Sequence, residues 1–264
     1  MLSSEQKQFK DALKKEPEYI DSIIKNLQKN HPSYANEVIR RKKNVSEYLG
    51  IWYELMVYDW LCKQGKKPSP QPFAPDKKSK PDFVYKSNDI NIYIDVASVQ
   101  ESKNDEMLCE KPYFINRQAT SSFAAMRERL LDKLGKHKSI ADGRDTYVIC
   151  LGLESSYIDV DDVITCFIGN RIVNILGGKD RTSKDGDIYE QENNRSLLVK
   201  YKSVSAILVA KRNYTLAEDR NKLAFWLIQN PYANTKIPPT EFDGISRWVV
   251  LAETDDFLEM GWQN

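Results

Sequence analysis

Histidine is scarce in this sequence, and its scarcity excludes whole classes of catalytic site. The chain of 264 residues contains two histidines, His31 and His137. A zinc site built from three histidines cannot form within one such chain, and a Ser-His-Asp triad would have to use one of these two residues. If the protein is an enzyme, we therefore expect carboxylates, lysines and metal ions to carry its chemistry.

Cysteine pairs and long apolar runs are missing as well. The four cysteines, Cys62, Cys109, Cys150 and Cys166, form no CxxC pair, which argues against a zinc knuckle and favours free thiols in a reducing compartment. The N-terminal stretch lacks the apolar core of a signal peptide. The longest nearly apolar run, 49–62, is interrupted by two acids and is too short to span a bilayer. These absences predict a cytoplasmic protein that does not enter a membrane.

The chain also has almost no net charge. Its 39 Lys and Arg against 38 Asp and Glu give a net charge of +1, which excludes a strongly basic coat as the basis of any nucleic-acid binding. Apolar residues make up 41% of the chain, so it should fold around a sizeable core. We expect a charged helical extension over 1–45, with Pro32 at a helix start, and one α/β domain over 46–264.

Apolar periodicity and turn residues predict the elements of this α/β domain. The first half should contain a buried helix over 46–64, capped by Ser46 and ended by Gly65, then a polar loop over 66–80, a hairpin of strands 83–86 and 90–99, a helix from Ser121 or Ser122 to about 137 and a strand over 146–151. The second half should contain a helix over 159–167, an exposed excursion over 177–195 and strands over 197–202, 204–210, 224–229 and 248–251.

Three acids stand out because their neighbours in the sequence are apolar. Glu54 lies inside the most hydrophobic helix, Asp82 opens the first hairpin strand, and Asp95 lies between Ile94 and Val96 in the second. A buried carboxylate costs several kcal/mol unless it is paired, protonated or bound to a metal. Three such acids close together indicate a shared cation, and Mg²⁺ prefers hard oxygen ligands of this kind.

The order of these residues resembles the PD-(D/E)xK nuclease superfamily. A helix with an inward Glu54, then Pro81-Asp82 at a strand, then Asp95-Val96-Ala97 in the next strand match that pattern. The resemblance covers about residues 46–152. It implies a restriction-endonuclease-like mixed central sheet flanked by helices, with Asp82 and Asp95 as ligands of Mg²⁺ or Mn²⁺.

The sequence departs from the superfamily at the motif lysine. Residues i and i+2 of a strand share a face, so a lysine two positions after Asp95 would meet the same site, but that position holds Ala97. Lys133, on the polar flank of the next predicted helix, is the leading substitute. Lys103, just past the strand, and Gln100, on the opposite strand face, are weaker candidates.

The resemblance implies metal-dependent phosphodiester hydrolysis of DNA, with Glu54, Asp82, Asp95 and Lys133 as site residues. Two alternatives stay open: a catalytically impaired nuclease fold that acts as a nucleic-acid-binding or assembly module, and a metal-independent α/β protein whose acids are all salt-bridged. A homodimer would suit an enzyme that cuts both strands. Exposed basic residues are candidates for phosphate contacts, which position a substrate without reading its sequence: Arg40, Arg41, Arg127 and Arg129.

Overall fold

The computed structural model describes most of the chain, namely residues 17–44, 46–100, 121–136, 138–140, 144–154, 158–169, 187–190, 197–212, 223–253 and 257–263. Its helices are α2 (Pro17–Asn30), α3 (Pro32–Lys42), α4 (Tyr48–Lys63), α6 (Ser121–Leu134), α7 (Val160–Ile168), α8 (Leu197–Lys200) and a short 3₁₀ helix (Lys138–Ile140). Its strands are β1 (Ser69–Pro70), β2 (Phe83–Ser87), β3 (Ile90–Gln100), β4 (Thr146–Glu154), β5 (Asp187–Glu190), β6 (Ala206–Arg212), β7 (Leu223–Gln229), β8 (Ser246–Glu253) and β9 (Phe257–Gln263).

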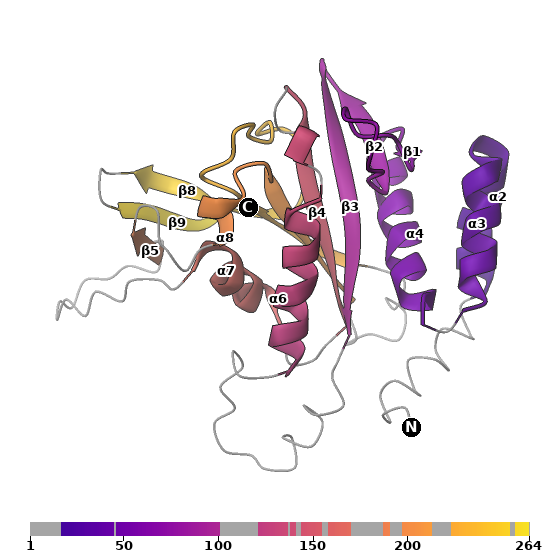
Figure 1. Ribbon diagram of the computed structural model, residues 1–264, viewed down its shortest axis with the longest axis horizontal. Coiled ribbons are helices and arrows are strands. Elements are labelled where there is room, and N and C mark those ends of the chain that lie inside the picture. The colour runs from indigo at the N-terminus through magenta and orange to yellow at the C-terminus, as the bar shows by residue number, and fades with distance from the viewer. Residues whose placement is uncertain are drawn as a thin grey trace, which may run out of the picture.

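In the described part of the chain, these strands form one nine-stranded mixed sheet in the order β1-β2-β3-β4-β6-β7-β8-β9-β5 (Figure 1). The predicted hairpin is present, because β2 and β3 pair antiparallel. Strands β3, β4 and β6 then run parallel to one another, while β6 and β7 pair antiparallel. The mixed α/β architecture with a central sheet and flanking helices is therefore confirmed.

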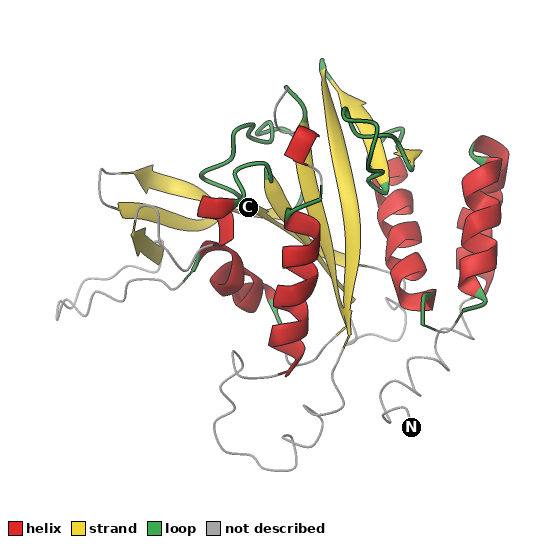
Figure 2. Cartoon of the chain, in the orientation of Figure 1, coloured by secondary structure: helices red, strands yellow, loops and turns green. Residues whose placement is uncertain are grey.

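Helices cover both faces of this sheet, as Figure 2 shows. On β3 the side chains of Ile92, Ile94 and Val96 belong to the apolar cluster that includes α2, α3 and α4. Tyr93 and Ala97, at the alternate positions, belong to the cluster that includes α6 and α7. This alternation is the period-two pattern of a strand buried on both faces, and it fixes which helix each β3 side chain meets.

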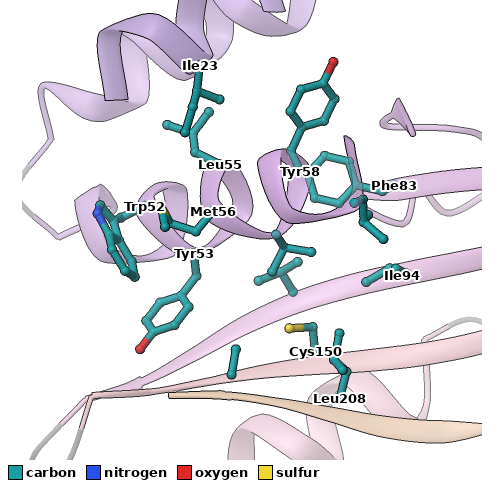
Figure 3. Packing of buried hydrophobic residues seen from close by; sticks show 14 of the residues in the cluster. Ile23, Trp52, Tyr53, Leu55, Met56, Tyr58, Phe83, Ile94, Cys150 and Leu208 are labelled. Atoms are coloured by element: carbon teal, nitrogen blue, oxygen red, sulfur yellow. The ribbon is translucent and has the colours of Figure 1, made fainter. Parts of the chain in front are cut away.

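Helix α4 is buried on most sides, as its sequence predicts. Trp52, Tyr53, Leu55 and Val57 are each at most 1% exposed, and Figure 3 shows how the helix packs between α2 and the central strands. Burying each large apolar side chain contributes about 1.5–3 kcal/mol, so this one helix is a major source of stability. The helix ends where predicted, because Gly65 adopts a positive φ of 74° that favours glycine.

The N-terminal helices belong to the same core as α4. Ile20, Ile23 and Leu27 of α2 and Val38 of α3 are buried in the cluster that contains α4. Pro32 begins α3 as predicted. Among the described residues, no helix is long and apolar enough to cross a membrane.

Three local predictions were wrong. Residues 197–202 were expected as a strand, but Leu197 and Leu198 begin the short helix α8. The excursion over 177–195 contains strand β5, which pairs with a strand that the sequence did not predict, β9. Ser46 does not cap α4, since the residue before its first turn is Glu47 and Ser46 instead donates its hydroxyl to Asn44. The first error arises because a short apolar run carries no distinctive period, and the second because β5 is set by its non-local pairing with β9.

Candidate active site

The hairpin brings two of the predicted acids together. Phe83 of β2 pairs with Ile94 of β3, so the next antiparallel position places Asp82 beside Asp95. The backbone N–H of Val96 donates a hydrogen bond to Asp82 Oδ2 at 2.6 Å. This bond fixes the carboxylate of Asp82 against the strand that carries Asp95. The sequence prediction of a paired Asp82 and Asp95 is therefore met by the backbone register.

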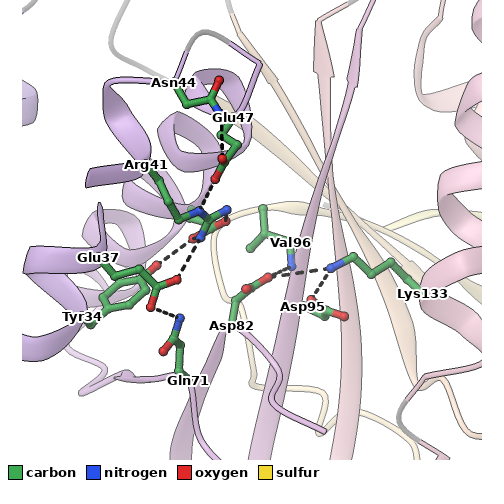
Figure 4. Close-up of polar contacts among 11 residues, drawn as sticks. Tyr34, Glu37, Arg41, Asn44, Glu47, Gln71, Asp82, Asp95, Val96 and Lys133 are labelled. Carbon is green, nitrogen blue, oxygen red and sulfur yellow. Dashed lines mark hydrogen bonds and ion pairs between the residues drawn. The ribbon is translucent and has the colours of Figure 1, made fainter. Parts of the chain in front are cut away.

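A lysine from helix α6 reaches this pair. Lys133 Nζ lies 2.5 Å from Asp95 Oδ1 and 4.0 Å from Asp82 Oδ2 (Figure 4). Asp95 shares its strand face with Tyr93 and Ala97, and α6 packs on that face. Ala97 is itself buried in the apolar cluster, so its methyl group fills the strand position while a cation arrives from a neighbouring helix.

A third group at the pair is the hydroxyl of Tyr147, which the sequence analysis missed. Tyr147 stands on β4 directly beside Tyr93 of β3. Its hydroxyl lies 3.3 Å from Asp95 Oδ2 and also 3.3 Å from the backbone oxygen of Lys133. Both contacts need the tyrosine proton, so the hydroxyl is shared between the strand acid and the helix that supplies the lysine. The only signal in the sequence was a polar-tipped aromatic in an otherwise aliphatic strand.

The pKa of Asp82 and the pKa of Lys133 are both raised, for different reasons. Burial, followed by the charges of Asp95 and Glu54, raises the pKa of Asp82 well above its ordinary value, while Lys133 opposes this shift. Burial disfavours the charged form of Lys133, but the nearby charges of Asp95 and Asp82 outweigh burial and raise the pKa of the amine. Lys133 is therefore an ammonium ion at neutral pH and serves as a cation, not as a base.

Glu54 is buried, as predicted, but it is occupied by a different set of partners. Its Oε2 accepts a hydrogen bond from the hydroxyl of Tyr34 at 2.8 Å, and its Oε1 accepts one from Arg41 Nη2 at 3.1 Å (Figure 4). Burial raises the pKa of Glu54, against the lowering effect of Arg41. Glu54 therefore joins α4 to α3. It affects the aspartate pair only electrostatically, because its negative charge raises the pKa of Asp82.

The donor set at the aspartate pair partly suits a divalent cation. Two carboxylates face one ammonium ion, and Mg²⁺ in proteins is often held by one or two carboxylates with waters completing its shell. Within the described ranges, no group of three or more His, Cys, Asp or Glu side chains could hold a metal ion. The pair therefore supplies two carboxylates, and Glu54, whose oxygens bind Tyr34 and Arg41, does not add a third.

The remaining predicted residues are dispersed. Arg41 is turned inward, with its Nε at 2.9 Å from Glu47 Oε2, so its guanidinium already has partners within the protein. Arg40, Arg127 and Arg129 are exposed, and so is Gln100 at the end of β3. Lys103 and His137 lie outside the described residues.

Comparisons of this chain with protein-family models, with curated proteins and with solved structures found no match. What the fold and the site define is a mixed α/β protein in which Lys133 of α6 lies beside the Asp82–Asp95 pair of the hairpin, with Asp95 buried and the other two side chains half-buried. The family resemblance depends on the motif and on this arrangement.

Proposed function

We propose that the protein is a metal-dependent phosphodiesterase of the PD-(D/E)xK type that acts on DNA. The observation that carries this proposal is the place of Lys133, whose amine contacts Asp95 from helix α6. The superfamily pattern has a lysine, and so a positive charge, beside the second acid, but the corresponding residue here is Ala97. An ammonium ion at that place supports an active site in which the lysine has moved to a neighbouring element.

Each residue then has a physical task. Asp82 and Asp95 would hold Mg²⁺ or Mn²⁺, which when bound supplies Lewis-acid stabilisation of a phosphate. Lys133, held as an ammonium ion, donates hydrogen bonds toward the negative charge that develops on the phosphate in the transition state. Glu54 acts from the outer part of the site, because its oxygens already bind Tyr34 and Arg41.

The alternative is a nuclease fold without activity that binds nucleic acid or assembles with a partner. It predicts that the space beside Asp95 is apolar or blocked. Lys133 in that space favours the enzyme, since a buried ammonium ion costs free energy that an apolar side chain would not. The third hypothesis, an entirely salt-bridged set of acids, explains the same contacts and is separated from the enzyme only by measured activity.

The test is a cleavage assay on plasmid and oligonucleotide DNA with Mg²⁺ or Mn²⁺. We expect the wild type to cut and Asp95→Asn and Asp82→Asn to be inactive while remaining folded. Asp89→Asn, on the exposed turn of the same hairpin, is the matched control and should cut like the wild type. Absence of metal-dependent cleavage by the wild type across several DNA substrates would overturn the proposed activity, and wild-type rates in either site variant would overturn the site.

A further inference from the structure

The loop that leads into Asp82 exposes an aromatic ring. Phe73 is 59% exposed, more than the other exposed large apolar side chains of the described residues, Leu251 at 47% and Trp262 at 37%. A single exposed apolar residue is common on protein surfaces and by itself indicates nothing. The residues around Phe73 distinguish it from such isolated apolar side chains.

Lysines surround this ring. Lys80 Nζ lies 4.5 Å from the centroid of Phe73, and Lys77 and Lys78 are exposed on the same loop. Over residues 71–80 the sequence has three lysines and a single acid, Asp76. Most of the ring remains in solvent although an ammonium group lies over it. An aromatic face combined with basic side chains is how proteins bind unpaired nucleotides without reading sequence.

The ring is also close to the aspartate pair. The backbone N–H of Gln71 donates to the backbone oxygen of Asp82 at 2.8 Å, which closes the loop at its base. Phe73 follows Gln71 by two residues and Lys80 precedes Asp82 by two residues. Consecutive Cα atoms are 3.8 Å apart, so both Phe73 and Lys80 lie within about 8 Å of this bridge. A strand bound at Asp82 would pass the ring with its adjacent nucleotides.

The loop holds the ring in place from both sides. Gln71 has a positive φ of 48° and donates its side-chain amide to Glu37 Oε2 at 2.8 Å, which ties the loop to helix α3 (Figure 4). On the other side Ala74 is buried and its N–H donates to the backbone oxygen of Ser79 at 2.9 Å. Phe73 therefore stands between two anchored residues, and a prepositioned ring loses little freedom when a ligand stacks on it.

We propose that Phe73 is a stacking platform for one unpaired base, with Lys77, Lys78 and Lys80 contacting the phosphates beside it. The inference rests on the proposed function and names the substrate more closely, as DNA that is single-stranded or opened next to the cut. Stacking needs a base that has left its pair, so the platform adds affinity for a single strand and adds little for a closed duplex. Loss of one such stack reduces affinity about tenfold.

The experiment measures binding separately from cleavage. Fluorescence anisotropy of the full chain in EDTA compares a labelled single-stranded oligonucleotide with a dumbbell duplex that has no free ends. We expect Phe73→Ala to weaken single-strand binding about tenfold and duplex binding less than twofold. Phe73→Trp should restore the affinity, and Leu251→Ala, which removes another exposed apolar side chain, should match the wild type.

The outcomes separate this inference from the proposed activity. If the wild type cuts DNA but Phe73→Ala binds the single strand normally, the platform is refuted and the activity stands. Equal weakening of both DNA forms, or failure of Phe73→Trp to restore binding, also refutes it. If binding depends on Phe73 but no metal supports cleavage, the platform stands and the nuclease proposal fails. If the wild type binds neither form, the platform is overturned.

Discussion

The ammonium group of Lys133 lies 2.5 Å from Asp95 Oδ1, although the two residues are 38 positions apart and belong to a helix and a strand. The same nitrogen is 4.0 Å from Asp82. One positive charge thus faces two carboxylates, which leaves the group with a net negative charge when both acids are ionised. A divalent cation would be attracted by the acids and repelled by the lysine, so Lys133 should weaken metal binding even as it supports catalysis.

Replacing Lys133 with methionine should therefore separate metal affinity from rate. A unit charge about 4 Å away is worth roughly 1–4 kcal/mol between water and a protein surface, so Lys133→Met should bind Mn²⁺ about tenfold more tightly or better. Loss of a preorganised charge partner should slow DNA cleavage about 100-fold or more. Calorimetric Mn²⁺ titration and single-turnover cleavage measure the two effects.

The matched control for that variant is Lys136→Met, one turn further along the chain. Lys136 is exposed just past the end of α6 and pairs with Asp132 of that helix at 2.6 Å, so its loss should change neither metal affinity nor rate. If Lys133→Met bound Mn²⁺ more weakly, the lysine would be organising the two acids instead of competing with the metal. Wild-type cleavage by Lys133→Met would remove it from the catalytic assignment.

Removing the hydroxyl of Tyr147 should loosen Asp95 without abolishing the site. Tyr147→Phe loses the contact to Asp95 Oδ2 and the contact to the backbone of Lys133. A hydrogen bond to a charged group contributes about 1.5–3 kcal/mol. We expect the Mg²⁺ concentration for half-maximal cleavage to rise about tenfold, with a smaller change in the rate at saturating metal.

Tyr85→Phe is the control for this effect on metal dependence. Its hydroxyl also donates to a buried acid, Glu241, at 3.1 Å, but on the opposite face of the sheet from Asp95. Both variants should lower the thermal midpoint by a few degrees, and only Tyr147→Phe should shift the Mg²⁺ dependence. If the Mg²⁺ concentration for half-maximal cleavage rose equally in the two variants, the Tyr147 contact would contribute only to stability.

Much of the hairpin and its acids could be predicted from the sequence, because each depends on local patterns. The β-branched and aromatic residues of β3 and a polar turn define the hairpin, and an acid between apolar strand residues is conspicuous because its burial costs free energy. Lys133 could be proposed because the helix period places it near the buried stripe of α6. Its partner could not be derived without the parallel β3–β4 pairing, which sets where α6 lies.

Other features depend on contacts that leave no local signature. The attachment of Glu54 to Arg41 joins two helices whose relative position follows from packing, so the sequence suggested a phosphate-facing arginine instead. The hydroxyl of Tyr147, on β4, contacts Asp95 on the neighbouring strand β3, and the sequence does not show that these strands pair. The pairing of β5 with β9 spans a long separation in the sequence, and the short run of β5 gave no period from which to infer it.

Removing Arg41 should destabilise the protein in a pH-dependent way. The pKa of Glu54 is already raised by burial above its ordinary value of 4.5, and Arg41 partly offsets that shift. Because a raised pKa favours the protonated acid in the fold, the stability that it lends is present at low pH and is lost as the pH rises through the folded-state pKa. Without Arg41 that pKa rises further. The free energy of unfolding of Arg41→Met should therefore lie only slightly below that of the wild type near pH 4.5 and about 2–3 kcal/mol below it at pH 8.

Urea unfolding of Arg41→Met at several pH values tests this, with Arg40→Met as the control. Arg40 is the exposed neighbour on the same helix, and its loss should cost less than about 0.5 kcal/mol at every pH. A deficit of Arg41→Met that is the same at pH 4.5 and pH 8 would show that the guanidinium stabilises α3 by packing and not by neutralising Glu54.

Two glycines near α4 should respond in opposite directions to the same added methyl group. A Cβ at Gly152 of β4 would overlap the ring of Tyr53, and that ring cannot easily swing aside because its hydroxyl donates to Glu154 Oε1 at 2.8 Å. Overpacking of this kind costs about 1–3 kcal/mol. At Gly50 an added Cβ meets nothing closer than Ser98 Oγ at 4.0 Å, and alanine is the better helix former by about 1 kcal/mol. Gly152→Ala should therefore lower the urea midpoint and Gly50→Ala should leave it unchanged or raise it.

Because the cost at Gly152 arises from one ring, the double variant Gly152→Ala, Tyr53→Leu should be more stable than the sum of the two single changes predicts. If the changes in the free energy of unfolding were strictly additive, the ring of Tyr53 would not be what packs α4 against Gly152 of β4.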